Sequence, residues 1–290
     1  MEINKIIIVG SGLMGSGIAQ VAAQSGKQVI ISDVSEKALE KAKASIVWSV
    51  GKMVEKKKVA EDAETILSRI TYAGNLDQAG DVLLAIEAVY ENMDLKIEIF
   101  RNLDRILSPQ ALIASNTSAI PITELAAVTS RPEQVLGLHF FSPVPMMQAV
   151  EVIKGIQTSE ETMAAGLAFA RSIGKDPIRV NKDVAGFVIN RINFPSAIEA
   201  MRLVEQGVAS CEDIDKGLRL ASGRKMGIFE TGDMVGLDIT YGALMAMYHE
   251  TGDPSWVPPL LLRRKVKAGH LGKKTGKGWY EYNADGTRKS

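Results

Sequence analysis

Short apolar runs alternate with longer amphipathic stretches over roughly the first 180 residues. The run Ile6-Ile7-Ile8-Val9 is apolar at every position and ends in glycine, which is typical of a parallel strand buried on both faces. The same reasoning predicts strands at 28–32, 82–89, 111–115, 135–140 and 149–153, and helices at 14–25, 35–58, 61–68, 93–107 and 160–173. The repeated strand–helix order predicts an α/β domain with a Rossmann-type, mostly parallel sheet covered by helices on both faces.

The pattern changes after Asp183. Residues 186–267 show helical periodicity and almost no strand-like runs, with helices predicted at 211–220, 239–249 and 259–268. Residues 284–290 are expected to be a frayed tail. We therefore predict an N-terminal α/β domain at 1–183, with a charged helical arm at about 35–70, and an all-α domain at 184–290.

A glycine-rich turn joins the first predicted strand to the first predicted helix. Gly10-Ser11-Gly12-Leu13-Met14-Gly15 matches the G-x-G-x-x-G pattern of dinucleotide-binding folds. In that pattern Gly10 permits the tight turn, Gly12 lets the backbone approach a pyrophosphate, and Gly15 lets the helix pack on the strand. The pyrophosphate is expected at the positive end of the helix.

Asp33 directly follows the second predicted strand, 23 residues after Gly10. A carboxylate at this place accepts hydrogen bonds from the adenosine ribose hydroxyls and repels the additional phosphate of NADP, so the predicted cofactor is NAD. The alternative structural role for Asp33 is the N-cap of the helix that starts near Ser35.

The second half of the predicted sheet carries polar side chains at or beside its strands: the segment Ser115-Asn116-Thr117-Ser118, then His139, then Glu151. A carboxylate beside an imidazole fixes the tautomer of the ring and raises its basicity. Oxidising a secondary alcohol requires removal of the hydroxyl proton, and a positioned base contributes roughly 10²–10⁴-fold to the rate. We interpret His139 as that base, Glu151 as its partner and Ser118 as a hydrogen-bond donor to the reacting oxygen.

Two other interpretations of these side chains stay open. His139 can be a structural histidine whose hydrogen bonds are satisfied within the core. Ser118, His139 and Glu151 can also form a serine-hydrolase triad. The triad interpretation lacks a G-x-S-x-G elbow and gives the glycine-rich turn no purpose.

Composition narrows the class of protein. The 290 residues carry 34 basic and 34 acidic side chains, so no broad basic field is expected for a nucleic acid or an acidic membrane. The single cysteine, Cys211, excludes a disulfide framework and a multi-cysteine metal site, and no metal is predicted. The N-terminal residues lack a secretory signal pattern, and no apolar run reaches the ~18 residues of a membrane span. A cytoplasmic protein without a membrane partner is expected.

Taken together, these motifs resemble the L-3-hydroxyacyl-CoA dehydrogenase family, and within it most closely the bacterial 3-hydroxybutyryl-CoA dehydrogenases. The resemblance covers residues 6–282 in order. Besides the segments already described, it includes residues 138–141 (LHFF), 186–191 (GFVINR), 212–215 (EDID), 236–238 (GLD) and 274–278 (KTGKG). Many matches in the right order are far more specific than any one of them.

The resemblance implies an NAD-dependent enzyme that oxidises a short-chain L-3-hydroxyacyl-CoA to the 3-ketoacyl-CoA and runs the reverse reduction. It implies a homodimer formed through the helical domain, with His139 as base, Glu151 as its partner, and Ser118 and Asn190 as hydrogen-bond donors to the substrate. The charged arm matches the family's coenzyme A arm, where Lys52 and Lys56 are the expected contacts, although each can simply lie on a solvated helix face. The expected cofactor contacts are Gly10, Gly12, Leu13, Met14, Gly15, Asp33, Glu91, Lys96, Asn116, Ser118, Ser142 and Lys274.

Three departures from the family pattern stand out. Ser142 replaces the usual asparagine after the His-Phe-Phe run, Ala185 replaces a common proline, and Ile228 replaces the proline of the Met-Gly-Pro-Phe-Glu run. Because Arg224 lies just before Ile228, an acyl group with a distal carboxylate, such as 3-hydroxyadipyl-CoA, is an alternative substrate.

Two competing functions remain. Dehydrogenases of free 3-hydroxy acids share the glycine-rich turn, but they typically use a catalytic lysine where this chain has Asn190. A non-catalytic protein that retained the fold is the second competitor, and the intact set of His139, Glu151, Ser118 and Asn190 speaks against it.

Overall fold

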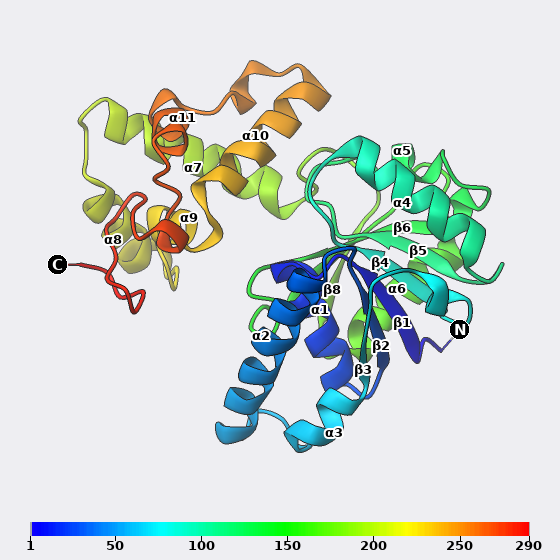
Figure 1. Cartoon of the computed structure of the whole chain (residues 1–290). Helices are drawn as coiled ribbons and strands as arrows, with labels where there is room; N and C mark the ends of the chain where they lie inside the picture. The colour runs from blue at the N-terminus through cyan, green and yellow to red at the C-terminus, as the bar shows by residue number, and fades with distance from the viewer. Residues whose placement is uncertain (1, 290) are drawn as a thin grey trace. The chain divides into compact units, whose positions relative to one another are not determined.

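The computed structural model describes residues 2–289 of the chain. The chain divides into two compact units, Met1–Phe187 and Val188–Ser290 (Figure 1). The first unit is the α/β unit and the second is helical.

An eight-stranded sheet forms the centre of the first unit, in the order β3-β2-β1-β4-β5-β6-β7-β8. All neighbouring strands are parallel except β6 and β7, which are antiparallel. The strands are β1 (Lys5–Val9), β2 (Gln28–Ser32), β3 (Ile70–Ala73), β4 (Leu84–Glu87), β5 (Leu112–Ser115), β6 (Val135–Phe140), β7 (Ala149–Ile153) and β8 (Asp176–Val180). The predicted Rossmann-type, mostly parallel fold is therefore confirmed.

Helices cover both faces of this sheet. The α-helices of the first unit are α1 (Leu13–Gln24), α2 (Glu36–Glu55), α3 (Ala63–Ser68), α4 (Met93–Ile106), α5 (Ile122–Ala126) and α6 (Glu160–Ser172), with short 3₁₀ turns at η1 (Asp77–Ala79) and η2 (Pro132–Gln134). Four of them begin at a side-chain N-cap, which satisfies one of the free N–H groups of the first turn. These caps are Ser35, Asp62, Asn92 and Ser159.

Side chains alternate between the two faces along each strand. Ile6, Ile8 and Leu138 belong to one buried cluster with side chains of α1 and α6. Residue 137 lies on the other face, because a Cβ added to Gly137 would meet Ile122 of α5. His139, two residues further along β6, therefore points to the face that α5 covers.

The structure corrects several expected elements. Strands β3 and β8 were not predicted, because β3 is short and β8 is largely polar, so neither contains an apolar run. The strand expected at 82–89 is limited to β4, and the expected helix at 35–58 ends at Glu55. Strand β7 runs antiparallel to β6, whereas the repeated strand–helix order favoured a parallel strand. No helix lies between β6 and β7, so the chain can return antiparallel at once.

The second unit consists of α7 (Ile189–Glu205), α8 (Cys211–Ser222), α9 (Ile228–Val235), α10 (Leu237–Thr251) and α11 (Leu260–Lys267), with the 3₁₀ turns η3 (Pro254–Trp256) and η4 (Lys273–Thr275). Helix α9 was not predicted. Its first turn is held by the buried carboxylate of Asp215, which accepts hydrogen bonds from the N–H groups of Phe229 and Glu230 at 2.9 Å each. These contacts span 14 and 15 residues of sequence, so they give no local signal.

The C-terminal segment is not frayed through Lys289, which corrects the expectation for 284–289; Ser290 lies outside the described residues. Tyr282 pairs with Arg288 as an isolated bridge, and Asn283 N–H donates to the carbonyl of Thr287. The Arg288 guanidinium lies 3.6 Å from the centre of the Tyr280 ring and 2.9 Å from the Glu212 carboxylate. These contacts anchor the end of the described chain.

Candidate active site

The glycine-rich turn connects β1 to α1 at the carboxyl edge of the sheet. Gly10 has φ +104°, and a Cβ there would lie 2.7 Å from the carbonyl oxygen of Ala88, so this position requires glycine. A Cβ on Gly15 would lie 1.9 Å from the carbonyl oxygen of Gly10. Gly12 differs, because a Cβ there would meet nothing within 4 Å. Gly10 and Gly15 are thus required by the fold, while Gly12 borders open space.

Gly12 is also the N-cap residue of α1 and makes no side-chain cap. The first N–H groups of an uncapped helix, together with the helix dipole, attract an anion. Leu13 is 73% exposed at the same turn. The turn therefore fits a pyrophosphate group that approaches the backbone at Gly12.

Asp33 lies at the end of β2 beside this turn. Its carboxylate accepts hydrogen bonds from the Ser11 N–H at 2.9 Å, the Ser11 hydroxyl at 2.7 Å and the Ser35 N–H at 2.9 Å. Partial burial raises the pKa of Asp33, but the hydrogen bonds from Ser35 and Ser11 outweigh it and hold the pKa below its ordinary value. The N-cap alternative for Asp33 is wrong, because the Ser35 hydroxyl caps α2.

Two exposed side chains near the turn carried no sequence signal. Val34, which follows β2, is 97% exposed, and Tyr90, which follows β4, is 88% exposed. Strands β2 and β4 flank β1, so both side chains lie at the edge of the sheet that carries the glycine-rich turn. Exposed apolar surface at this edge suits the planar rings of a nucleotide.

A buried ion cluster follows β4. Lys96 is 1% exposed, and its Nζ lies 2.6 Å from Glu87 Oε1 and 3.2 Å from Glu91 Oε2. Sequence reasoning missed Glu87, which is fully buried and also accepts a hydrogen bond from the Ser115 hydroxyl at 2.6 Å. Lys96 was predicted to touch the cofactor, but here its ammonium is enclosed and holds Glu87 and Glu91 in place.

Glu91 in turn holds the segment after β5. Its Oε1 accepts hydrogen bonds from the Ser118 N–H at 2.9 Å and from the Thr117 hydroxyl. Burial raises the pKa of Glu91, but the charge of Lys96 and the hydrogen bonds from Thr117 and Ser118 hold it below its ordinary value. Asn116 links the same segment to β6, since its Oδ1 accepts a hydrogen bond from the Phe140 N–H at 3.0 Å.

His139 and Glu151 face each other across the antiparallel pair β6 and β7. His139 Nδ1 lies 2.6 Å from Glu151 Oε2; the imidazole side chain is 8% exposed and the carboxylate is fully buried. Because a carboxylate accepts the hydrogen of Nδ1, Nε2 is the nitrogen that takes up a proton. The two side chains form a buried imidazole–carboxylate pair near the carboxyl end of β6.

Two aromatic rings flank this imidazole. The ring of Phe141 is centred 4.6 Å from that of His139, and the ring of Phe187 is centred 5.6 Å away. Phe187 has φ +49° and follows Gly186 at φ +76°, so two successive residues adopt the left-handed conformation. The chain turns here in a way that places the buried Phe187 ring against the histidine.

Ser142 and the loop after β6 come next along the chain. Lys175 is 8% exposed, and its Nζ donates to the carbonyl oxygens of Val144 and Met147 at 2.7 Å each. Val144 packs on α1, because a Cβ on Gly17 would lie 2.8 Å from the Val144 Cβ. Ser142 is partly buried and belongs to this loop, which is held by Lys175 through two carbonyl groups and by the packing of Val144 on α1.

The remaining predicted residues lie elsewhere. Asn190 is the second residue of α7 in the second unit, and Lys274 in the same unit forms an ion pair with Asp238 at 2.6 Å. Lys52 lies on the exposed side of α2 and forms an ion pair with Glu55 at 2.7 Å. Lys56 is exposed and is the C-cap residue of the same helix.

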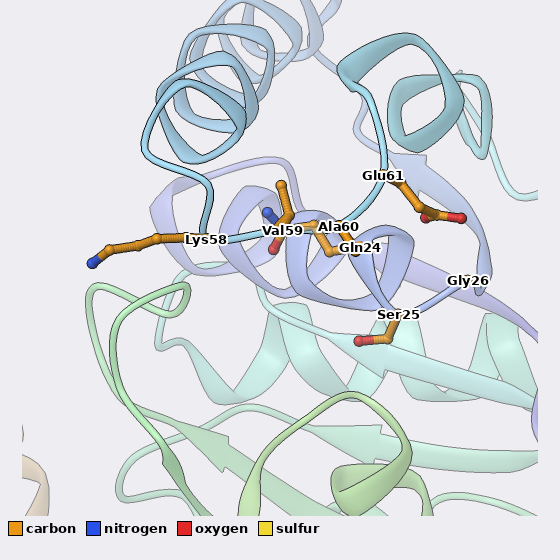
Figure 2. Close-up of a pocket in the computed structure, with 7 residues that line it drawn as sticks. All are labelled: Gln24, Ser25, Gly26, Lys58, Val59, Ala60 and Glu61. Carbon is orange, nitrogen blue, oxygen red and sulfur yellow. The ribbon is translucent and has the colours of Figure 1, made fainter.

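Figure 2 shows a pocket of about 510 Å³ lined by Gln24, Ser25, Gly26, Lys58, Val59, Ala60 and Glu61. It lies beside the C-terminal end of α1, and the glycine-rich turn lies at the N-terminal end, one helix length of roughly 18 Å away. In Figure 2 the Lys58 and Glu61 side chains point away from each other. Glu61 is bound to Arg69. This pocket is not the candidate active site.

Among residues 2–289, no group of three or more His, Cys, Asp or Glu side chains is arranged to hold a metal ion. None of the helices described for this chain has the length and apolar character needed to cross a bilayer.

Comparisons with known proteins agree with this geometry. The NAD-binding domain of 3-hydroxyacyl-CoA dehydrogenase matches residues 5–184, and the C-terminal domain of that family matches residues 186–282. A probable 3-hydroxybutyryl-CoA dehydrogenase of Bacillus subtilis is 44% identical over 283 residues, which are 97% of this chain and 98% of that protein.

Two solved structures are also similar. The crystal structure of FadB2 from Mycobacterium tuberculosis gives a TM-score of 0.94 at 40% identity and covers 98% of this chain and 100% of that one. The (S)-3-hydroxybutyryl-CoA dehydrogenase PaaH1 of Ralstonia eutropha gives a TM-score of 0.90 at 43% identity and covers 97% of this chain and 100% of that one.

The chain therefore belongs to the 3-hydroxyacyl-CoA dehydrogenase family, which confirms the resemblance of the sequence. It is an NAD-dependent oxidoreductase with an NAD-binding domain followed by the helical C-terminal domain of the family.

Proposed function

We propose that this protein oxidises a short-chain L-3-hydroxyacyl-CoA, such as 3-hydroxybutyryl-CoA, to the 3-ketoacyl-CoA, and catalyses the reverse reduction. The observation that carries the proposal is the buried pair of His139 and Glu151, 2.6 Å apart, in the same sheet as the glycine-rich turn. The names of the relatives and the match of both family domains support the substrate class.

The residues of the glycine-rich turn, together with Asp33, fit the NAD cofactor. The open space at Gly12 and the uncapped start of α1 suit a pyrophosphate, and the fixed carboxylate of Asp33 suits the ribose hydroxyls. Bound NAD supplies the acceptor for the hydride that leaves the alcohol carbon. We assign further cofactor contacts to Leu13, Met14, Glu91, Asn116, Ser142 and Lys274, with Lys96 positioning Glu91.

The protein's own contribution is to move a proton. In oxidation the substrate hydroxyl gives its proton to His139 Nε2, and Glu151 stabilises the imidazolium that forms. In reduction the same imidazolium returns the proton to the developing alkoxide. Ser118 and Asn190 donate hydrogen bonds to the substrate oxygens. The flanking rings of Phe141 and Phe187 exclude water from the imidazole, which strengthens its interaction with the carboxylate.

The rest of the chain serves binding and assembly in this proposal. Residues 1–183 bind NAD, with the arm at 35–70 contacting coenzyme A through Lys52 and Lys56. Residues 184–290 complete substrate binding and form a homodimer. Exposed apolar side chains of the second unit, among them Ile192, Val208, Leu220 and Ile239, are available for a contact between copies. We place the protein in the cytoplasm.

The test is an NADH absorbance assay of the purified protein with acetoacetyl-CoA, with free acetoacetate and with a dicarboxylic 3-ketoacyl-CoA. We expect turnover of the C4 thioester, with NADH preferred over NADPH. Turnover of free acetoacetate but not of its thioester would favour the free-acid alternative. A strong preference for the dicarboxylic ester that is lost in Arg224→Ala would favour the 3-hydroxyadipyl-CoA alternative. Sedimentation analysis of the same sample tests the homodimer.

A further inference from the structure

Helix α2 carries a tryptophan on the side turned away from the core. Its buried residues are Leu39, Ala42, Ile46 and Val50. Trp48 lies between Ile46 and Val50 in sequence, about 160–200° around the helix from both at 3.6 residues per turn. It is 68% exposed. A tryptophan side chain offers about 150–250 Å² of largely apolar surface. Exposing that surface to water is unfavourable unless a ligand covers it.

The surroundings of Trp48 leave its ring accessible. The positions one turn away are Ala44, Ser45, Gly51 and Lys52. Three of these side chains are small, and a Cβ added at Gly51 would meet nothing within 4 Å. A flat ligand can therefore approach the indole without displacing other side chains.

The charge next to Trp48 is positive. Lys52 lies one turn further along the helix, and the exposed Lys56, Lys57 and Lys58 follow at its end, against the single carboxylate of Glu55 in this stretch. An exposed indole next to clustered cations is the combination that binds an aromatic base attached to phosphates.

We propose that Trp48 is the surface on which the adenine ring of the substrate's coenzyme A stacks, with Lys52 and Lys56 contacting the phosphates of the same nucleotide. This inference rests on the proposed function, because it takes the substrate to be a coenzyme A ester. It assigns the occupant by chemistry: a purine supplies the flat ring, and the phosphates supply the negative charge that the lysines complement. Trp48 then determines preference for the complete ester over its shortened forms.

The main test compares two substrates in wild-type and Trp48→Ala proteins. Acetoacetyl-CoA carries the adenine nucleotide, and acetoacetyl-pantetheine has the same reacting end without it. We expect Trp48→Ala to raise KM for acetoacetyl-CoA about tenfold, the size of one lost base–aromatic stack, with little change in kcat. The preference for the CoA ester over the pantetheine ester should fall by the same factor. Trp48→Phe, which keeps a ring, should lose less.

Val47→Ala is the matched control, because Val47 is the exposed neighbour of Trp48 on the same helix. It should keep the preference for the CoA ester. An unchanged KM for acetoacetyl-CoA in Trp48→Ala would overturn the inference. So would an equal loss on both substrates, or a change in sedimentation that shows Trp48 to be a contact between copies. Inactivity of the wild type on acetoacetyl-CoA would instead contradict the proposed function.

Fluorescence gives a readout that does not depend on turnover. Trp256 is 6% exposed, and Trp279 is partly buried with its ring packed on that of Phe229, so Trp48 is the most exposed of the three tryptophans. Adenosine 3′,5′-bisphosphate should quench the wild-type emission and leave Trp48→Phe unquenched. Equal quenching of both proteins would overturn the stacking assignment.

Discussion

Buried carboxylates occur in both units of the molecule, and their partners differ. Glu151 in the first unit is fully buried and faces the Nδ1 atom of His139 at 2.6 Å. Asp233 in the second unit is 1% exposed and accepts hydrogen bonds from two backbone N–H groups, those of Trp279 and Tyr280, and from the Tyr282 hydroxyl. The Asp233 carboxylate therefore holds backbone segments together, whereas the Glu151 carboxylate orients a ring that can itself gain or lose a proton.

In the proposed function, this difference separates a carboxylate that serves the fold from one that serves the reaction. Asp215 repeats the pattern of Asp233, with the N–H groups of Phe229 and Glu230 and the Tyr280 hydroxyl as its donors. Burial alone therefore does not identify an active site; the identity of the partner does. The following experiments test the distinction by substituting one member of each kind.

Among the carboxylate and glycine variants, the largest effect on activity is expected from Glu151→Gln. The amide cannot stabilise an imidazolium as a carboxylate does, so kcat should fall about tenfold to a hundredfold. This loss is smaller than that expected from removing the general base itself. The thermal midpoint should change little, since the amide has the same shape. Steady-state assays with acetoacetyl-CoA and calorimetry give both numbers. A large fall in stability with kcat retained would place Glu151 with Asp233 instead.

The two glycines of the turn provide a second pair. Gly15→Ala should destabilise the protein by about 1–3 kcal/mol, because its methyl group would lie 1.9 Å from the Gly10 carbonyl oxygen. Gly12→Ala should leave stability nearly unchanged and weaken NAD binding about tenfold or more, because its methyl group occupies the path of the pyrophosphate. Calorimetry and NAD titration check this, and equal effects at both positions would contradict it.

Asp233→Asn should show the reverse of Glu151→Gln. The side-chain amide would turn a donor toward groups that are themselves donors, at a cost of about 1–3 kcal/mol in the free energy of unfolding. Activity per folded molecule should stay within about twofold of the wild type, a ratio well below the effect of losing a general base. Denaturant titration and the NADH assay test both halves, and a stable but inactive variant would be the contrary outcome.

The smallest effect concerns pH. The pKa of Glu91 is held below its ordinary value of 4.5, so the native protein binds fewer protons there than the unfolded chain does. The stabilisation is complete above that value and is lost as the pH falls through the folded-state pKa. The stability advantage of wild type over Glu91→Gln should therefore shrink in acid.

Asp233 should give the opposite sign, because burial raises its pKa in spite of its hydrogen bonds. Its ionisation opposes folding as the pH rises through that pKa, so the advantage of wild type over Asp233→Asn should grow in acid. Thermal melts between about pH 3 and 7 test both signs, since that range spans ordinary carboxyl values. Curves of the same slope for the two variants would contradict the comparison.

Much of the fold and the site could be predicted because the signals are local. Strand β1, the glycine-rich turn and α1 follow from one short segment. The contact of His139 with Glu151 was expected from adjacent strands, but the antiparallel register that places them opposite each other was not, since nothing in the sequence sets the direction of β7.

The features that were missed depend on contacts between distant segments. The resemblance to the family implied a cofactor contact for Lys96, but its burial against the fully buried Glu87 had no pattern in the sequence. Asp233 bonds to residues 46 to 49 positions away, which no periodicity reveals. The exposure of Trp48 was not predicted either, because an apolar residue in an amphipathic helix is expected to face the core.

The central claim is that the His139 imidazole moves the substrate proton. The direct measurement is kcat of His139→Gln with acetoacetyl-CoA, together with its Kd for NAD and its thermal midpoint. The account predicts a fall in kcat of roughly 10²–10⁴-fold with NAD binding and stability retained. A folded variant that keeps more than about a tenth of wild-type turnover would contradict it.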